Sequence, residues 1–191
     1  MKIEANDALI VVDVQNDFCP GGALAVAGGD GIVAGINALS PKFPVRVFTR
    51  DWHPADHCSF SADPQFVDKS WPAHCVADTP GARFHSRLAV PADASIVNKG
   101  TDAAKEAYSG FDNTPLAEAL RARGVRRVFV CGLATDYCVK ATALDAVKNG
   151  FDTFAIEDLC RGVDIPAGTA RAALDAMRGA GVRTCTSGEL A

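Results

Sequence analysis

Short apolar runs alternate with amphipathic stretches along the whole chain, and this alternation constrains the fold more than any other feature of the sequence. It is typical of a sheet whose parallel strands are connected by helices. Right-handed crossovers between parallel strands place helices on both faces of the sheet. The sequence therefore predicts an α/β fold, a three-layer α/β/α sandwich around a mainly parallel six-stranded sheet. The predicted strands run from Ala8 to Val14, Val45 to Arg50, Ala94 to Asn98, Arg127 to Cys131, Thr153 to Glu157 and Val182 to Cys185.

Helices are predicted where apolar residues recur at helical spacing between these strands. The predicted helices cover residues 32–39, 114–124, 135–150 and 166–177. A length of 191 residues suits one domain, so we expect residues 1–191 to form a single domain.

The overall composition limits which binding partners and which cellular location we expect. The formal charge of −4 comes without a dense Lys/Arg block, so neither nucleic acid nor an anionic membrane is an expected partner. The N-terminus lacks the basic start and the long apolar core of a signal peptide, and no apolar run reaches the roughly 20 residues that span a bilayer. The seven cysteines are scattered and form no CxxC pair, which favours reduced thiols. We expect a cytoplasmic monomer or homo-oligomer that acts on a small molecule.

Four reactive residues follow predicted strands. Ligands of open α/β sheets bind beyond the carboxyl ends of the strands. Asp13 lies at the end of the first strand, Asp51 and Lys99 just past the second and third, and Cys138 shortly after the fourth. We therefore expect these four side chains to meet at one edge of the sheet. Taken singly, Asp13 could cap a turn, and Lys99 could be a solvated lysine.

Cys138 is the candidate nucleophile. It follows Thr135 at the predicted start of a helix, and Thr135 is the expected N-cap. Because a helix N-terminus favours a thiolate, we expect the pKa of the Cys138 thiol to be lowered. The alternative is a small buried apolar residue, which is how we interpret Cys131. We expect Cys19, Cys160 and Cys185 to be unreactive as well.

Residues 51–93 break the alternating pattern, carry repeated prolines and contain all four histidines of the chain. A loop this long in a compact domain is usually functional or disordered. Asp51 with His53, His57 and His74 offers the ligands of a divalent metal such as zinc, iron or manganese, and the alternative is a set of surface histidines. Cys58 and Cys75 adjoin two of the histidines and could be rival ligands. His85 has no partner pattern, and we expect it at the surface.

These motifs resemble those of the nicotinamidases and pyrazinamidases within the isochorismatase-like cysteine hydrolases. The resemblance runs along nearly the whole chain. The matching stretches are ALIVVDVQNDFCPGGAL at 8–24, RDWHPADH at 50–57, WPAHC at 71–75, KG at 99–100, YSGF at 108–111 and GLATDYCV at 132–139.

The resemblance implies an isochorismatase-like hydrolase fold and a set of site residues. It implies a catalytic triad of Asp13, Lys99 and Cys138, with an oxyanion hole formed by the backbone N–H groups of Ala134 and Cys138 after a cis peptide. A divalent metal would be held by Asp51, His53 and His74, and some members use a histidine at the position of His57 as a further ligand. The substrate ring would lie against Phe18, Trp71 and Tyr108, beside Ala134.

The implied reaction is the hydrolysis of nicotinamide to nicotinic acid and ammonia through a cysteine thioester, with pyrazinamide as a further substrate. Two other functions stay open at this point. One is another amidase or carbamoyl hydrolase of the same superfamily, and the other is a metal-binding or ligand-binding protein without turnover. The Asp-x-His pair and the later histidine disfavour the first, and the presence of all three triad residues disfavours the second.

Overall fold

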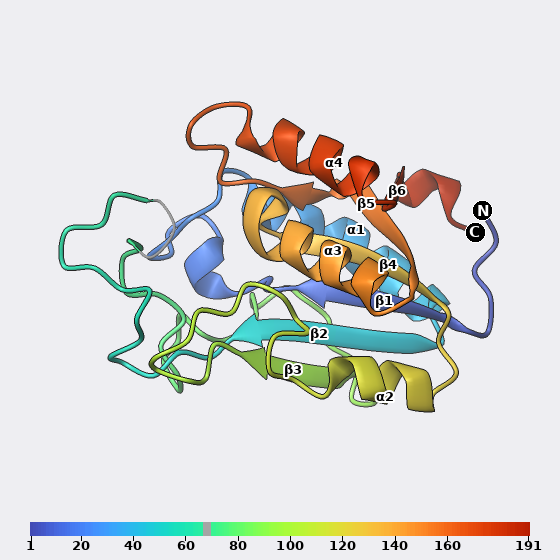
Figure 1. The fold of residues 1–191 in the computed structure, drawn as a ribbon, viewed down its shortest axis with the longest axis horizontal. Coiled ribbons are helices and arrows are strands. Elements are labelled where there is room, and N and C mark those ends of the chain that lie inside the picture. Colours follow the sequence, from blue (N-terminus) through green and yellow to red (C-terminus); the bar gives the residue numbers. More distant parts are fainter. Residues whose placement is uncertain (67–69) are drawn as a thin grey trace.

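The computed structural model describes residues 1–66 and 70–191. Six strands form one sheet in the order β3-β2-β1-β4-β5-β6, and every pairing in it is parallel (Figure 1). All the predicted strands are present, and the predicted fold class is confirmed. The strands are β1 Asp7–Val12, β2 Val45–Asp51, β3 Ser95–Lys99, β4 Arg127–Leu133, β5 Asp152–Arg161 and β6 Arg183–Cys185.

Four α-helices connect the strands. They are α1 Val33–Leu39, α2 Leu116–Ala122, α3 Lys140–Lys148 and α4 Thr169–Gly179. The connection from β1 to β2 runs one way across the sheet, and those from β3 to β4, β4 to β5 and β5 to β6 run the other way. Right-handed crossovers therefore place α1 on one face and the other three helices on the opposite face. Figure 1 shows α3 in front of the sheet and α1 behind it.

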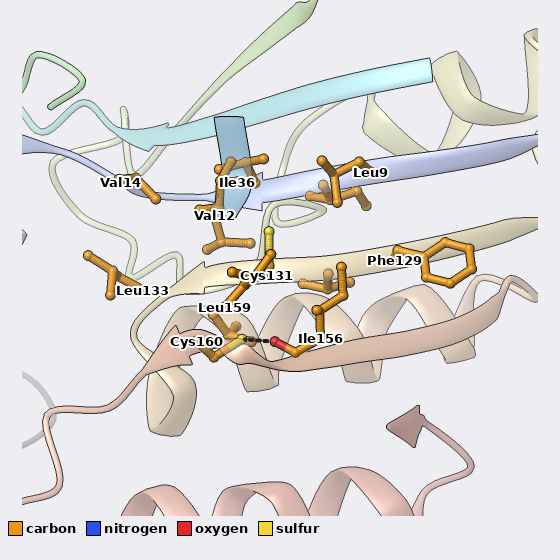
Figure 2. Close-up of a cluster of buried hydrophobic side chains, with 14 of the residues drawn as sticks. Leu9, Val12, Val14, Ile36, Phe129, Cys131, Leu133, Ile156, Leu159 and Cys160 are labelled. Atoms are coloured by element: carbon orange, nitrogen blue, oxygen red, sulfur yellow. Dashed lines mark hydrogen bonds between the residues drawn. The ribbon is translucent and has the colours of Figure 1, made fainter. Parts of the chain in front are cut away.

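The core lies between the central strands and these helices. Every residue of β1 is buried, as expected for a central parallel strand that is covered on both faces. Figure 2 shows Ile36 of α1, Val12 of β1, Cys131 of β4 and Ile156 of β5 within one cluster of buried side chains. These four residues are at most 1% exposed. The rigid centre of the sheet thus fixes the strand ends from which the reactive residues project.

Several predicted boundaries differ from those in the structure, and three of the differences have a local cause. The first strand ends at Val12 and not at Val14, because Asp13 adopts a left-handed backbone with φ of 49° that breaks the extended run. The fifth strand continues to Arg161, past a register shift in its pairing with β4. The last helix begins at Thr169 after a turn, and not at Pro166. Among the residues that the structure describes, none of the helices combines the length and the apolar character needed to cross a membrane.

Candidate active site

The carboxyl ends of four neighbouring strands carry the predicted reactive residues. Asp13 directly follows β1, while Asp51 and Lys99 are the last residues of β2 and β3 and lie opposite each other in the pairing of those strands. Cys138 follows β4, the other neighbour of β1. The structure therefore brings together all four residues, as the topology predicted.

The Lys99 ammonium group lies at the centre of this cluster. Its Nζ lies 2.9 Å from Asp13 Oδ2, 2.5 Å from Asp51 Oδ1 and 3.3 Å from Cys138 Sγ, and it also donates to the carbonyl oxygen of Ala107 at 3.2 Å. The side chain is completely buried. Burial alone would lower the pKa of Lys99, but the two carboxylates raise it well above its usual range. The lysine is therefore a buried cation that joins both acids to the sulfur.

Asp13 is held in place by its backbone and by a hydroxyl group. Its backbone N–H donates to the carbonyl oxygen of Thr49 at 3.2 Å, and the Thr49 hydroxyl donates to Asp13 Oδ1 at 2.6 Å. Its Oδ2 faces Lys99, so each carboxylate oxygen has a polar neighbour. Burial raises the pKa of the Asp13 carboxyl, while the neighbouring Lys99 acts in the opposite direction. A buried carboxyl with a raised pKa is suited to accepting a proton.

Cys138 lies in a π-helical turn, Thr135–Val139, that precedes α3. The expected N-cap was wrong: Ala134 precedes the turn and no side chain caps it, so Thr135 is already inside it. The expected direction of the pKa was also wrong. Burial raises the pKa of the Cys138 thiol well above its usual range, and Lys99 only partly opposes this. The thiol therefore needs a base, and Asp13 and Cys138 carry ligand atoms within 4.8 Å of each other.

A second group of side chains has the geometry of a metal site. Asp51, His53 and His74 are buried and offer ligand atoms that lie within 4.8 Å of one another. Each histidine uses Nδ1 for a backbone carbonyl, that of Gly100 at 2.9 Å for His53 and that of Pro72 at 2.7 Å for His74. Because a carbonyl only accepts, both Nδ1 atoms carry a proton, which leaves Nε2 as the atom of each ring that can bind a metal.

The protonation of these groups also suits a cation. Burial lowers the pKa of His74 to about 4, so its imidazole is neutral at neutral pH. Burial would raise the pKa of Asp51, but Lys99 and His53 lower it below its usual range, so the carboxyl is ionised. Burial would lower the pKa of His53, but Asp51 raises it above its usual value, so a metal ion would take the place of a proton on this imidazole. One carboxylate and two imidazoles form a ligand set that fits a divalent metal such as zinc or iron.

Asp13, Asp51 and Cys138 form another buried set of possible metal ligands, separate from the set with His53 and His74. The Lys99 ammonium already contacts all three residues. A second cation among them would meet strong repulsion, so the set around His53 and His74 is the better metal site.

The remaining candidate ligands lie outside both groups in the described part of the chain. The His57 ring is tilted by 33° against that of His53, with ring centroids 4.1 Å apart, but its nitrogens face Ser59 Oγ and the carbonyl oxygen of Lys105. This arrangement does not support His57 as a ligand. His85 is half-buried and accepts a hydrogen bond from the backbone N–H of Arg87.

The two cysteines of the loop have different environments. Cys58 is exposed, whereas Cys75 is buried, and burial raises the pKa of its thiol well above the usual range. Neither belongs to the metal-ligand group. The predicted metal-binding loop at 51–93 includes residues 67–69, which lie outside the described residues.

A pocket opens beside Cys138, Asp51 and His74. All four predicted substrate-binding residues line it, namely Phe18, Trp71, Tyr108 and Ala134. The Trp71 indole N–H donates to the Tyr108 hydroxyl at 3.0 Å, and this bond joins two segments of the pocket wall. The peptide bond between Leu133 and Ala134 is cis, as the resemblance implied.

Sequence reasoning missed several residues of this site. Leu24, Val26, Tyr137 and Val163 also line the pocket. Tyr137 packs edge-on against Trp71, with ring centroids 4.9 Å apart. Its position next to Cys138 was a usable signal, but nothing in the sequence indicates that residues 24, 26 and 163 come together.

Sequence reasoning also missed Gln15, whose side chain bonds both backbone groups of Asp51. Its side-chain amide accepts from the Asp51 backbone N–H at 2.8 Å and donates to the Asp51 carbonyl oxygen at 2.8 Å. A further bond to the carbonyl oxygen of Ala82 at 2.9 Å extends the contact to the loop. A buried glutamine that satisfies a strand end in this way fixes the backbone of a candidate metal ligand.

Comparisons with known proteins agree with this geometry. Residues 7–189 match the isochorismatase domain family. The nicotinamidase/pyrazinamidase of Mycobacterium tuberculosis is 48% identical over 191 residues, which cover 94% of this chain and 99% of that protein.

Two solved structures are similar over nearly their whole length. The pyrazinamidase of Pyrococcus horikoshii in complex with zinc has a TM-score of 0.86 and 45% identity, covering 95% of this chain and 99% of that one. The L. infantum protein PnC1 in complex with nicotinate has a TM-score of 0.91 and 40% identity, covering 100% and 98%.

Proposed function

The chain belongs to the isochorismatase family, and from this premise we propose that it is a nicotinamidase, which hydrolyses nicotinamide to nicotinic acid and ammonia and also accepts pyrazinamide. The observation that carries the proposal is the position of Lys99. Its Nζ contacts both Asp13 Oδ2 and Cys138 Sγ, and Cys138 lies in the wall of an aromatic pocket that also contains Asp51 and His74.

The pocket suits a flat, uncharged aromatic amide. Its walls are aromatic and aliphatic, so they favour a ring that can be desolvated at little cost. Cys138 offers a nucleophile for the amide carbonyl, and the metal-ligand pair Asp51 and His74 lies in the same pocket for a polar ring atom. The nicotinate bound to the L. infantum protein and the pyrazinamidase name of the P. horikoshii protein support this substrate class.

The first half of the reaction uses all three triad residues. Asp13 accepts the thiol proton of Cys138, and the sulfur attacks the amide carbonyl to form a C–S bond. The Lys99 ammonium keeps the carboxylate and the developing thiolate close together and stabilises both charges. Ala134 and Cys138 both line the pocket, and their backbone N–H groups would stabilise the oxyanion.

The second half releases both products. Asp13 returns the proton to the amide nitrogen, the C–N bond breaks, and ammonia leaves. A water molecule, deprotonated by Asp13, then attacks the thioester, and the C–S bond breaks to give the carboxylic acid and the free thiol. An acid is needed in the first half because an amide nitrogen is a poor leaving group until it is protonated.

Asp51, His53 and His74 would hold one divalent metal, with zinc, iron and manganese as the candidates. The zinc complex of the P. horikoshii pyrazinamidase supports such a site. A metal bound there supplies a Lewis-acidic coordination position for the ring nitrogen of the substrate. Residues 51–93 would serve as the metal-binding loop of a single domain. The cytoplasmic location of the protein stays a prediction.

An ammonia-release assay with nicotinamide tests the proposal. The wild-type protein should release ammonia and nicotinic acid in equal amounts, and Cys138→Ala should reduce the rate by at least about 10³-fold because covalent catalysis is lost. Cys131→Ala is the matched control, since it removes a buried thiol away from the pocket. A wild-type protein without turnover of nicotinamide, or a Cys138→Ala variant with wild-type activity, would contradict the proposal.

A further inference from the structure

Asp136 precedes the proposed nucleophile by two residues, and only 3% of its surface is exposed. Its carboxylate accepts hydrogen bonds from the backbone N–H groups of Val163 at 2.9 Å and Asp164 at 2.8 Å. It also accepts one from the Thr169 hydroxyl at 2.8 Å. All three donors belong to residues 162–169, which connect the end of β5 to the first residue of α4. One side chain of the nucleophile turn thus holds this connection at three points.

The connection is packed closely around the carboxylate. A Cβ atom at Gly162 would lie 3.2 Å from Asp136 Oδ1 and 2.6 Å from the Cβ of Ala170. A larger residue at position 162 would therefore push the connection away from Asp136. The carboxylate also bonds the first residue of α4, where the partial positive charge of the helix N-terminus stabilises a negative group. Packing, hydrogen bonds and charge all favour this one arrangement.

Val163 makes the connection relevant to the substrate. It lines the pocket together with Ala134 and Cys138, and its own backbone N–H is one of the groups that Asp136 holds. The pocket wall formed by Val163 and the turn that carries Cys138 are therefore joined through the Asp136 side chain. If this bond is lost, Val163 is free to move relative to the sulfur.

We infer that Asp136 is a positioning residue for substrate binding, which acts by holding Val163 against the pocket at a fixed distance from Cys138. The inference rests on the proposed nicotinamidase function and adds a residue that touches neither the substrate nor the metal ligands. Asp136 affects how tightly the pocket binds the substrate ring. The chemical step itself uses other residues.

The test is the steady-state kinetics of Asp136→Asn with nicotinamide. The amide keeps the shape of the side chain, but its NH₂ group cannot accept, so either the bond from Val163 or the bonds from Asp164 and Thr169 are lost. Loss of hydrogen bonds to a charged group should raise KM about tenfold. The kcat should stay within about threefold of the wild-type value, because the triad is untouched. Thr169→Val removes one of the three bonds and should raise KM less, about threefold.

Asp164→Ala is the matched control, because one carboxylate oxygen of Asp164 accepts both of its bonds and an asparagine would keep them. The Asp164 carboxylate lies in the same connection and also accepts two backbone N–H groups, those of Gly168 at 2.9 Å and Ala170 at 3.0 Å. It does not line the pocket. Its replacement should lower the melting temperature and leave KM within about twofold of the wild-type value. A rise in KM as large as that of Asp136→Asn would show that any loosening of the connection has the same effect, and would overturn the assignment.

A double-mutant cycle with Val163→Ala tests the route of the effect. If Asp136 acts through Val163, then Asp136→Asn should raise KM less than about threefold in the Val163→Ala background. Full additivity of the two changes would overturn the inference, as would an unchanged KM in Asp136→Asn alone. Both kinetic tests require that the wild-type protein hydrolyses nicotinamide. A wild-type protein without that activity would refute the proposed function instead.

Discussion

Gly100→Ala is the substitution whose effect follows most directly from the geometry of the metal-ligand group. Gly100 adopts a left-handed backbone with φ of 63°, and its carbonyl oxygen accepts the Nδ1–H of His53. A Cβ atom at this position would lie 2.3 Å from His53 Cε1 and 2.5 Å from Nδ1. Since atoms do not approach so closely, the imidazole ring has to move.

Two separate costs follow, and one control separates them. The left-handed backbone costs an alanine about 1–2 kcal/mol of folding free energy wherever it occurs. Gly124 has a similar φ of 69° with no atom near its missing Cβ, so Gly124→Ala carries the backbone cost alone. Gly100→Ala should in addition displace His53 and lose its bond to the carbonyl, and loss of such a supporting contact lowers metal affinity about 10–100-fold.

Metal titration of the chelator-treated proteins, followed by nicotinamide turnover at each metal concentration, measures this difference. Both variants should unfold at lower urea concentration than the wild type. Only Gly100→Ala should need about 10–100-fold more metal for half-maximal activity. Equal metal dependence in Gly100→Ala and Gly124→Ala would refute the role given to His53.

Further predictions concern the buried charges and the thiols. Lys99→Met should destabilise the protein by about 3–5 kcal/mol in urea unfolding, because two buried carboxylates lose their shared cation. Adding Asp13→Asn to that variant should recover part of the loss, and a double variant less stable than Lys99→Met would contradict this explanation. Burial raises the pKa of Cys160 to about 12, so at pH 8 only about one thiol in ten thousand is ionised. In the native protein, iodoacetamide should therefore label the exposed Cys58 much faster than Cys160, and the two rates should become comparable only after unfolding. Mass spectrometry measures both rates. Fast labelling of Cys160 in the native protein would contradict the burial assigned to it.

Much of the site could be predicted because it depends on topology. Asp13, Asp51 and Lys99 each follow an apolar strand, and the carboxyl ends of parallel strands meet at one edge. Knowing where the strands end was enough to bring these residues together. The histidines were candidate metal ligands because of their residue type and their shared loop, whereas the aromatic residues came from family motifs, because no periodic pattern marks them.

The features that could not be predicted arise from contacts distant in sequence or from burial. The pKa of Cys138 was expected to fall because only the start of a helix was visible, whereas the desolvation that raises it depends on the surrounding layers. Gln15 meets the backbone of Asp51 only because β1 and β2 are neighbours in the sheet. Val163 reaches the pocket through a connection whose course no local pattern specifies.

The formation of a thioester on Cys138 is the central claim, and acid quenching of the enzyme during nicotinamide turnover tests it most directly. Peptide mass spectrometry of the quenched wild-type protein should find one nicotinoyl group on Cys138 and none on the other cysteines. A nicotinoyl group on a different residue, or turnover at the wild-type rate by Cys138→Ala, would contradict the account.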